Sequence, residues 1–274
     1  MKKIYIIFIV SIFYTFSFLC ANPPEKLTIS VSIPPLYFFV NQIAKDKAII
    51  TTIIPTNKNA EIYEPDFASM EVIGKSEIFI GIGMPFEKIW IPKILNANKT
   101  QDKLYTIMLD EKLYSHSHAH LWLSLNNAKK ITKILADEFS KYDSKNSAFY
   151  HENAQKLLTS IVALEAKIPV IINDMPHKDF IIYHPIFDEF AHEFNLIEHS
   201  LEKHGKKYGV ADIISLSQLG KKIQIKRIFT QNKNNDIVTL AKSINAQVIL
   251  IDPLSQDYLT NLESILQEIS KSYE

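Results

Sequence analysis

Three histidines alternate with small residues in one short segment of the chain. The segment SHSHAHLWLS begins at Ser115 and holds His116, His118 and His120 before it becomes apolar. Imidazole is a common metal ligand, but imidazoles on an unordered loop bind metal only weakly. The apolar residues that follow can fix the backbone of His120, which makes it the candidate for a built site. For His116 and His118, accessory metal capture and a solvated loop without function both remain open.

Three other polar residues stand where predicted strands end. Glu61 lies in the loop after a strand, and His184 and Asp252 each close a strand. A proline follows both His184 and Asp252, and proline suits the first turn of a helix. In open α/β sheets, ligands bind beyond the carboxyl ends of the strands, so these positions are the ones to inspect for chemistry.

Each of these residues also has a purely structural explanation. Asp252 can cap a helix, Glu61 can be a solvated loop carboxylate, and His184 can satisfy an ordinary hydrogen bond. Together with His120, however, they supply two imidazoles and two carboxylates from equivalent strand ends. Those are the ingredients of a divalent metal site, which we therefore expect at Glu61, His120, His184 and Asp252.

The elements that must position these residues alternate between strand and helix. Apolar alternation predicts strands, and apolar residues at spacings of three and four predict helices. This order favours parallel sheets covered on both faces, so the expected fold class is α/β. The expected strands are 27–33, 48–54, 77–82, 105–109, 180–183, 227–230 and 247–251, and the expected helices are 36–44, 66–74, 123–142, 185–194, 236–244 and 259–273.

One long helical pattern separates the two halves of the chain. Residues 146–168 contain no glycine or proline, place apolar residues at helical spacing, and end at Pro169. We interpret them as one rigid helix that joins two lobes; an ordinary helix within one large sheet is the alternative. The expected domains are a lobe at 22–145, a linker helix at 146–170 and a lobe at 171–274.

The first residues have the organisation of a secretory signal peptide. Within residues 1–21, two lysines precede an apolar run, and small residues precede a polar, proline-rich break. The apolar run is shorter than the roughly 20 residues that span a bilayer. We therefore expect cleavage after Ala21 and export to the periplasm. Lipid attachment at Cys20 is an alternative that the bulky Leu19 disfavours.

Composition narrows the function classes. The roughly 250 residues after the signal peptide suit two domains of ordinary size. The chain has 30 Lys and Arg against 30 Asp and Glu, interspersed, which favours neither nucleic acid nor anionic lipid as a partner. Cleavage at the expected point removes the single cysteine, and with it disulfides and thiolate ligands. His-Glu-x-x-His, Gly-x-Ser-x-Gly and glycine-rich phosphate motifs are absent from the sequence.

Four short motifs carry a resemblance to a known family. Over nearly all of its mature length, the chain resembles the periplasmic solute-binding proteins of zinc and manganese ABC transporters, the ZnuA-like or cluster A-I family. The resemblance implies two α/β lobes tied by one long helix, metal ligands at the four residues above, and a monomer that delivers metal to an inner-membrane permease. The motifs are Tyr63-Glu64-Pro65, His120-Leu121-Trp122-Leu123-Ser124, Tyr183-His184-Pro185-Ile186-Phe187 and Ile251-Asp252-Pro253-Leu254.

One departure from the family pattern bears on the metal. The family usually has a histidine two residues before the Tyr-Glu-Pro tripeptide, and here that residue is Glu61. Zinc-binding members typically offer three histidines, whereas manganese-binding members offer two histidines and two carboxylates. Zinc accepts mixed ligation and outcompetes manganese at such sites, so zinc is favoured, with manganese or iron as the alternative. His116 and His118 resemble a short form of the metal-collecting, histidine-rich loop of zinc-binding members.

Two other function classes are alternatives to metal capture for a transporter. An exported metal-dependent hydrolase needs a water-filled position beside three protein ligands, whereas the four candidates here can close the shell. We therefore expect no enzyme. An exported adhesin or a metal chaperone on the same fold remains open, because fold does not determine function.

Overall fold

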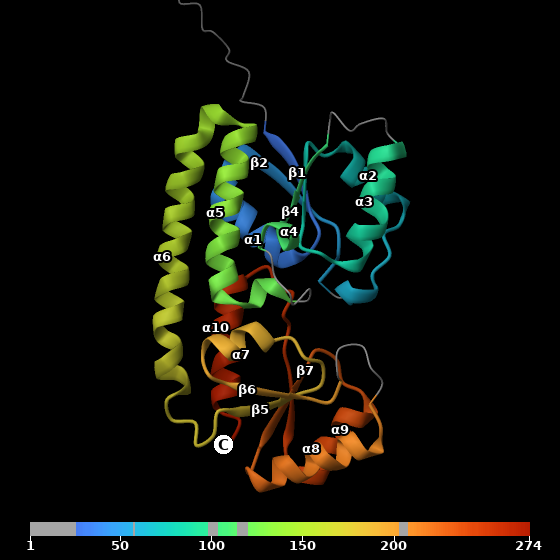
Figure 1. Cartoon of the computed structure of the whole chain (residues 1–274), viewed down its shortest axis with the longest axis vertical. Helices are drawn as coiled ribbons and strands as arrows, with labels where there is room; N and C mark the ends of the chain where they lie inside the picture. Colours follow the sequence, from blue (N-terminus) through green and yellow to red (C-terminus); the bar gives the residue numbers. More distant parts are fainter. Residues whose placement is uncertain (1–25, 57, 98–103, 114–119, 203–207) are drawn as a thin grey trace, which may run out of the picture.

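The chain forms two lobes that stand one above the other in Figure 1. The computed structural model describes residues 26–274 apart from 57, 98–103, 114–119 and 203–207. Each lobe is built on a four-stranded sheet in which every pairing is parallel. The expected α/β class with two lobes is confirmed. The predicted signal peptide lies outside the described residues.

The N-terminal lobe holds a sheet in the order β2-β1-β3-β4. β1 and β3 are central and almost wholly buried, because helices cover both faces of a parallel sheet. All four strands were expected from the sequence at similar bounds. The elements are β1 (Leu27–Val31), α1 (Pro34–Ala44), β2 (Ala48–Thr52), α2 (Phe67–Lys75), β3 (Ile78–Gly81), α3 (Pro85–Ala97), β4 (Tyr105–Met108) and α4 (Leu109–Leu113).

The C-terminal lobe repeats this arrangement with the order β6-β5-β7-β8. In both sheets the chain first adds a strand on one side of the starting strand and then returns to the other side. Such a reversal opens a crevice at the carboxyl ends of the two central strands. The elements are β5 (Asp179–Ile182), α7 (Asp188–Glu193), β6 (Ile197–Ser200), α8 (Val210–Lys222), β7 (Arg227–Thr230), α9 (Asn235–Ile244), β8 (Gln247–Leu250) and α10 (Tyr258–Ser270).

Strand β6 was not expected from the sequence. It is an edge strand of four residues, IEHS, and its one apolar side chain, Ile197, is 51% exposed. An edge strand with so little apolar surface leaves no alternation to recognise. Helices α3 and α8 were also missed, and α3 carries an internal proline, Pro92.

Helix α6 (Ser147–Ile172) runs beside α5 (Leu125–Tyr142) and spans both lobes along one side of the molecule (Figure 1). It continues beyond Pro169, where the helical pattern in the sequence was expected to end. Pro169 has no N–H to donate to the carbonyl four residues earlier, so the last turn lacks one helical hydrogen bond. Ile168 and Ile172, both buried, hold that turn on the core. No helix among the described residues is both long and apolar enough to cross a membrane.

The two lobes share one hydrophobic core in addition to the linker helix. A single cluster of buried apolar side chains includes Phe79 of the first sheet and Phe180 of the second. At its centre the indole Nε1 of Trp122 donates to the carbonyl of Pro253 over 2.9 Å. The hydroxyl of Tyr258 donates to the Trp122 carbonyl over 2.5 Å. These contacts join the segment after His120 to the segment after β8.

A polar contact adds to this junction. The carboxylate of Glu193, at the end of α7, accepts from the Ser124 hydroxyl and, over 3.2 Å, from the Leu125 N–H at the start of α5. An anion at a helix N-terminus satisfies otherwise unpaired N–H groups and is favoured by the helix dipole. Burial nevertheless raises the pKa of Glu193 above its usual range. The C-terminal lobe thus caps a helix of the N-terminal lobe.

Candidate metal centre

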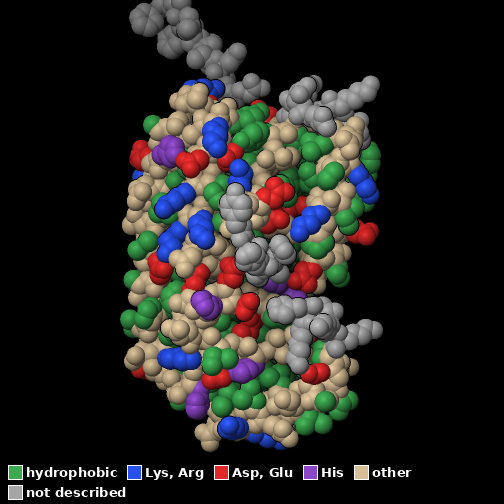
Figure 2. Space-filling model, viewed as in Figure 1, with side chains coloured by type: hydrophobic (Ala, Val, Ile, Leu, Met, Phe, Trp, Pro, Cys, Tyr) green, Lys and Arg blue, Asp and Glu red, His purple; other side chains and the backbone are tan. Residues whose placement is uncertain are grey.

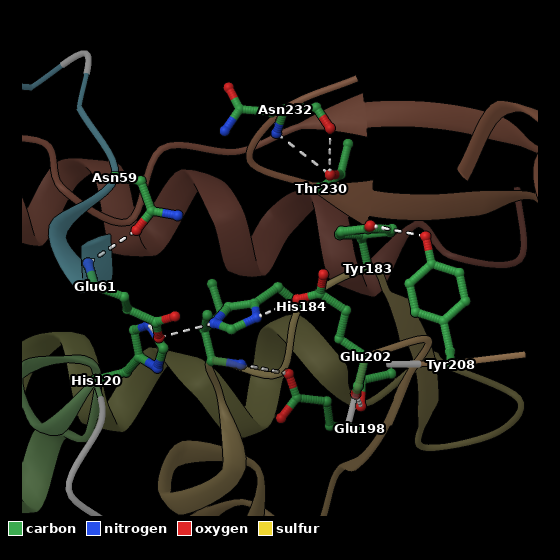
Figure 3. Close-up of polar contacts among 12 residues, drawn as sticks. Asn59, Glu61, His120, Tyr183, His184, Glu198, Glu202, Tyr208, Thr230 and Asn232 are labelled. Atoms are coloured by element: carbon green, nitrogen blue, oxygen red, sulfur yellow. Dashed lines mark hydrogen bonds and ion pairs between the residues drawn. The ribbon is translucent and has the colours of Figure 1, made fainter. Parts of the chain in front are cut away.

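Glu61 is held by a short turn, η2 (Ala60–Ile62), in the loop after β2. The side-chain oxygen of Asn59 accepts from the Glu61 N–H over 2.8 Å and caps the turn. On one side of Glu61 the side chain of Ala60 is buried, and on the other the Tyr63 ring packs edge-on against Phe86, with ring centroids 5.8 Å apart. This turn directs the carboxylate of Glu61 towards the C-terminal lobe (Figure 3).

His120 stands at the start of a buried 3-10 turn, η3 (Leu121–Leu123). Its backbone is left-handed, with φ 61° and ψ 27°, and its carbonyl accepts from the Leu123 N–H over 3.0 Å. A left-handed conformation at a residue other than glycine costs on the order of 1 kcal/mol and persists only where the surroundings enforce it. Burial of Leu121, Trp122 and Leu123 enforces it here. The His120 side chain is itself only 9% exposed.

His184 follows the carboxyl end of β5. The preceding Tyr183 N–H still donates to the Phe229 carbonyl over 2.8 Å, which extends the ladder with β7. Beyond Pro185, the N–H groups of Ile186 and Phe187 donate to the Glu198 carboxylate over 2.9 and 3.2 Å. Both sides of His184 are therefore held, and its side chain is 22% exposed.

The three side chains converge on one point (Figure 3). Glu61 Oε1 lies 3.0 Å from His184 Nε2 and 3.5 Å from His120 Nε2. Among the described residues, Glu61, His120 and His184 are the one group of three whose candidate ligand atoms all lie within 4.8 Å of one another. Two donors at zinc-ligand distances around a tetrahedral ion stand about 3.3 Å apart. The two measured separations bracket that value, so the donor set fits a small divalent metal.

The remaining predicted residues are placed differently. Asp252 is exposed, and its Oδ1 accepts from the Leu254 N–H over 2.9 Å, so its carboxylate closes a local turn. It lies outside the group of three. His116 and His118 fall outside the described residues.

Charge and burial act differently on the three ionisable groups. Burial lowers the pKa of His120 to about 4, against an opposing effect of Glu61, so this ring is neutral and free to coordinate at neutral pH. The hydrogen bond from His184 holds the pKa of Glu61 below its usual range. Burial opposes protonation of His184, but the carboxylates of Glu61 and Glu202 outweigh it and raise the pKa of the ring.

The group of three opens into a cavity of about 150 Å³ between the lobes. Its wall includes Asn59 and Met84 from the N-terminal lobe and Thr230 and Asn232 from the C-terminal lobe. In the space-filling view, acidic and histidine side chains gather in the middle of the molecule, where the two lobes meet (Figure 2). A cavity of this volume holds an ion together with a few water molecules.

Glu202 is a residue at this site that the sequence did not reveal. Its Oε2 lies 2.7 Å from Nδ1 of His184, on the ring edge that faces away from Glu61 (Figure 3). It follows β6, a strand without an apolar pattern, so the sequence does not mark this strand end as a place for a ligand. The sequence carried no signal for it, because the contact between Glu202 and His184 arises only from the pairing of β6 with β5.

Comparison with known proteins gives a consistent family match. The model of a family described as zinc-uptake complex component A, periplasmic (ZnuA), matches residues 29–272. A putative metal-binding protein of Chlamydia trachomatis is 23% identical over 245 residues, covering 86% of this chain and 88% of that protein. The high-affinity zinc uptake system protein ZnuA of Bacillus subtilis is 23% identical over 253 residues, which cover 84% of this chain and 79% of that protein.

Solved structures agree with the sequence comparisons. The crystal structure of a ZnuA deletion mutant with zinc bound superposes with a TM-score of 0.83 at 26% identity. The match covers 91% of this chain and 99% of that one. The resemblance inferred from the four sequence motifs is confirmed.

Proposed function

Because the chain belongs to the ZnuA family of periplasmic zinc-uptake components, we propose that it captures a divalent metal ion, zinc before manganese, and passes it to an ABC permease. The family consists of substrate-binding proteins rather than enzymes. The observation that carries the proposal is the spacing of the three donors. Two imidazole nitrogens and one carboxylate oxygen stand at separations that suit zinc, in a cavity between the lobes.

We assign Glu61, His120 and His184 as the metal ligands. The fourth position is open to Asp252, once its carboxylate leaves the Leu254 N–H, or to a water molecule in the cavity. Two nitrogen donors favour zinc over manganese, because affinity at such sites follows the Irving–Williams order. The zinc-bound relative supports the same choice.

The rest of the proposal concerns the setting of the site. The protein acts in the periplasm as a monomer, after export by the predicted signal peptide. His116 and His118, four and two residues before His120 in the sequence, serve as accessory groups that collect metal near the cleft.

Metal analysis of untagged protein tests the proposal. Protein isolated from periplasm without added metal is expected to contain zinc at about one ion per chain. After chelation, titration calorimetry should give one tight site for zinc and a weaker one for manganese at the same position, in the order expected for nitrogen-containing donor sets. Absence of a stoichiometric site for either ion would refute the function.

Glu61 provides the first test of the assignment. Glu61→Ala should weaken zinc binding about tenfold or more, because one of the three donors is lost. Glu61→His restores the imidazole usual in the family and should keep tight zinc binding while lowering the affinity for manganese. Competition titrations with the two metals measure both effects.

The matched control is Glu64→Ala, which removes an exposed carboxylate from the same loop. This variant should bind both metals like the unmodified protein. If Glu61→Ala also bound zinc with unchanged affinity, Glu61 would be only a loop carboxylate and the site would have to be reassigned.

A further inference from the structure

Glu202 and His184 occupy matching positions beyond two neighbouring parallel strands. The register of β5 with β6 pairs Ile182 with Ser200, so two further steps along each strand bring His184 opposite Glu202. The backbone follows this register past the ends of the strands. The Leu201 N–H donates to the Ile182 carbonyl over 3.1 Å, and the Glu202 N–H donates to the Tyr183 carbonyl over 2.9 Å. The sheet itself therefore delivers a carboxylate to the side of the His184 ring.

The two ring nitrogens of His184 face two different carboxylates. Nδ1 lies 2.7 Å from Glu202 Oε2, and Nε2 lies 3.0 Å from Glu61 Oε1, at the point where the donors converge. An ionised carboxylate only accepts hydrogen bonds, so each carboxylate favours a proton on the ring nitrogen that it faces. The shorter contact, 2.7 Å to Glu202 against 3.0 Å to Glu61, favours the proton of the neutral ring at Nδ1. A neutral ring protonated at Nδ1 presents its lone pair at Nε2, which is the atom aimed at the metal position.

We infer that Glu202 is a positioning residue, which holds His184 in the Nδ1–H tautomer and keeps Nε2 directed at the metal. This inference rests on the proposed function. Histidines that ligate metals commonly donate their other N–H to a carboxylate, and loss of that partner typically lowers metal affinity by about 10–100-fold.

The carboxylate of Glu202 is itself held in place. The Ser200 hydroxyl donates to the Glu202 backbone carbonyl over 2.7 Å, which fixes the turn that carries the residue. The Glu202 side chain is 32% exposed, so protein atoms cover most of it. A ring pinned at one edge loses less freedom when the metal binds, and this contributes to affinity.

Glu61 is a second carboxylate that can accept a hydrogen bond from the His184 ring. If Glu202 is removed, Glu61 is the carboxylate that remains beside the ring, and it faces Nε2. The proton is then drawn to the nitrogen that the metal needs. The inference therefore predicts an inversion of the tautomer as well as a loss of affinity.

The same sheet offers a matched control. His199 Nε2 lies 2.6 Å from Asp179 Oδ1, so this is a second histidine–carboxylate pair between β5 and β6. Asp179 is the first residue of β5, at the opposite end of the strand from His184. Asp179→Asn removes a charge and weakens an ion pair in the same two strands without touching the metal site.

The first measurement follows the tautomer. Long-range ¹H–¹⁵N NMR spectra of chelated protein, recorded well above the usual histidine pKa, report which ring nitrogen carries the proton. His184 is assigned by the signals lost in His184→Ala. The unmodified protein, Asp179→Asn and Glu202→Gln should all show Nδ1–H at His184, because the Gln carbonyl can still accept. Glu202→Ala should show a shift to Nε2–H.

The second measurement is zinc affinity. Glu202→Ala should bind zinc about 10–100-fold more weakly than the unmodified protein. The zinc affinity of Glu202→Gln should lie between those two. Asp179→Asn should bind zinc as tightly as the unmodified protein. X-ray absorption of zinc-loaded Glu202→Ala should keep the ligand number of the unmodified protein.

Three results would overturn the inference: an unchanged His184 tautomer in Glu202→Ala, unchanged zinc affinity in the same variant, or loss of one zinc–oxygen contact, which would make Glu202 a direct ligand. A failure of the proposed function is distinguishable from these, because then the unmodified protein itself would bind no zinc. The tautomer measurement needs no metal and stands on its own.

Discussion

Zinc affinity is expected to fall at least about a hundredfold when either His120 or His184 is replaced by alanine. Structural zinc sites with four ligands bind with about 10–16 kcal/mol, so one ligand accounts for about 3 kcal/mol. A loss of that size corresponds to about two orders of magnitude in the dissociation constant. Titration calorimetry of each variant against the unmodified protein measures it.

The same loss should be visible in thermal unfolding. A ligand that binds only the folded state stabilises it by about 4 kcal/mol at a thousandfold excess over Kd, and each kcal/mol raises the melting temperature of a chain of this size by about 2–4 °C. Zinc should therefore raise the melting temperature of the unmodified protein by about 8–16 °C. Either histidine variant should lose most of this rise.

A third histidine serves as the control. His151 is an exposed residue of α6 that approaches Asp137 at 3.9 Å, away from the cleft. His151→Ala should keep the full zinc-dependent rise. Retention of that rise in His120→Ala or His184→Ala would show that the group of three is not the metal site.

The second large effect is expected at Trp122, which joins the two lobes. Trp122→Ala should lower the free energy of unfolding by about 3–5 kcal/mol, because a 1% exposed indole is deleted and a cavity remains. The Pro253 carbonyl also loses its donor. The expected fall in melting temperature is about 6–20 °C, measured by calorimetry in the presence of a chelator.

The chain has only one other tryptophan, and it provides the comparison. Trp90 lies on α3, is partly exposed, and has the amino group of Lys93 4.4 Å from its ring centroid. Trp90→Ala should lower the free energy of unfolding clearly less than Trp122→Ala does, because Trp90 buries less apolar surface in the folded protein. Equal losses in the two variants would mean that the junction between the lobes contributes no special stability.

The sequence could predict the elements that bury apolar residues in a regular pattern. β1 and β3 are central strands, and their apolar runs were recognised at nearly the observed bounds. Edge strand β6 was not recognised because three of its four residues are polar, so no apolar pattern marks it. Glu202 was missed for the same reason, since its relation to His184 exists only through the register of two strands.

The grouping of Glu61, His120 and His184 was predictable because each lies next to an element with a recognisable pattern: Glu61 in the loop after β2, His120 before the buried Leu121–Leu123 turn, and His184 after the buried strand β5. The direction in which each side chain points within such a group could not be predicted from the sequence. Asp252 closes its strand as expected, but its carboxylate turns back to the Leu254 N–H, a choice made by local hydrogen bonding. Helix α6 passes Pro169 because tertiary packing of Ile168 and Ile172 outweighs a local preference.

The core shared by the two lobes also constrains how the ion can leave. Opening the cleft would expose Trp122 and Tyr258, and returning each ring to water costs about 4–6 kcal/mol at about 25 cal/mol per Å². The binding-competent fraction of the population is therefore close to one, and no affinity is lost to a closing step. Spontaneous opening is correspondingly rare, so the residence time of the ion is set by its coordination bonds. A permease that accepts this cargo must then distort the loops that carry the ligands, rather than wait for the lobes to part.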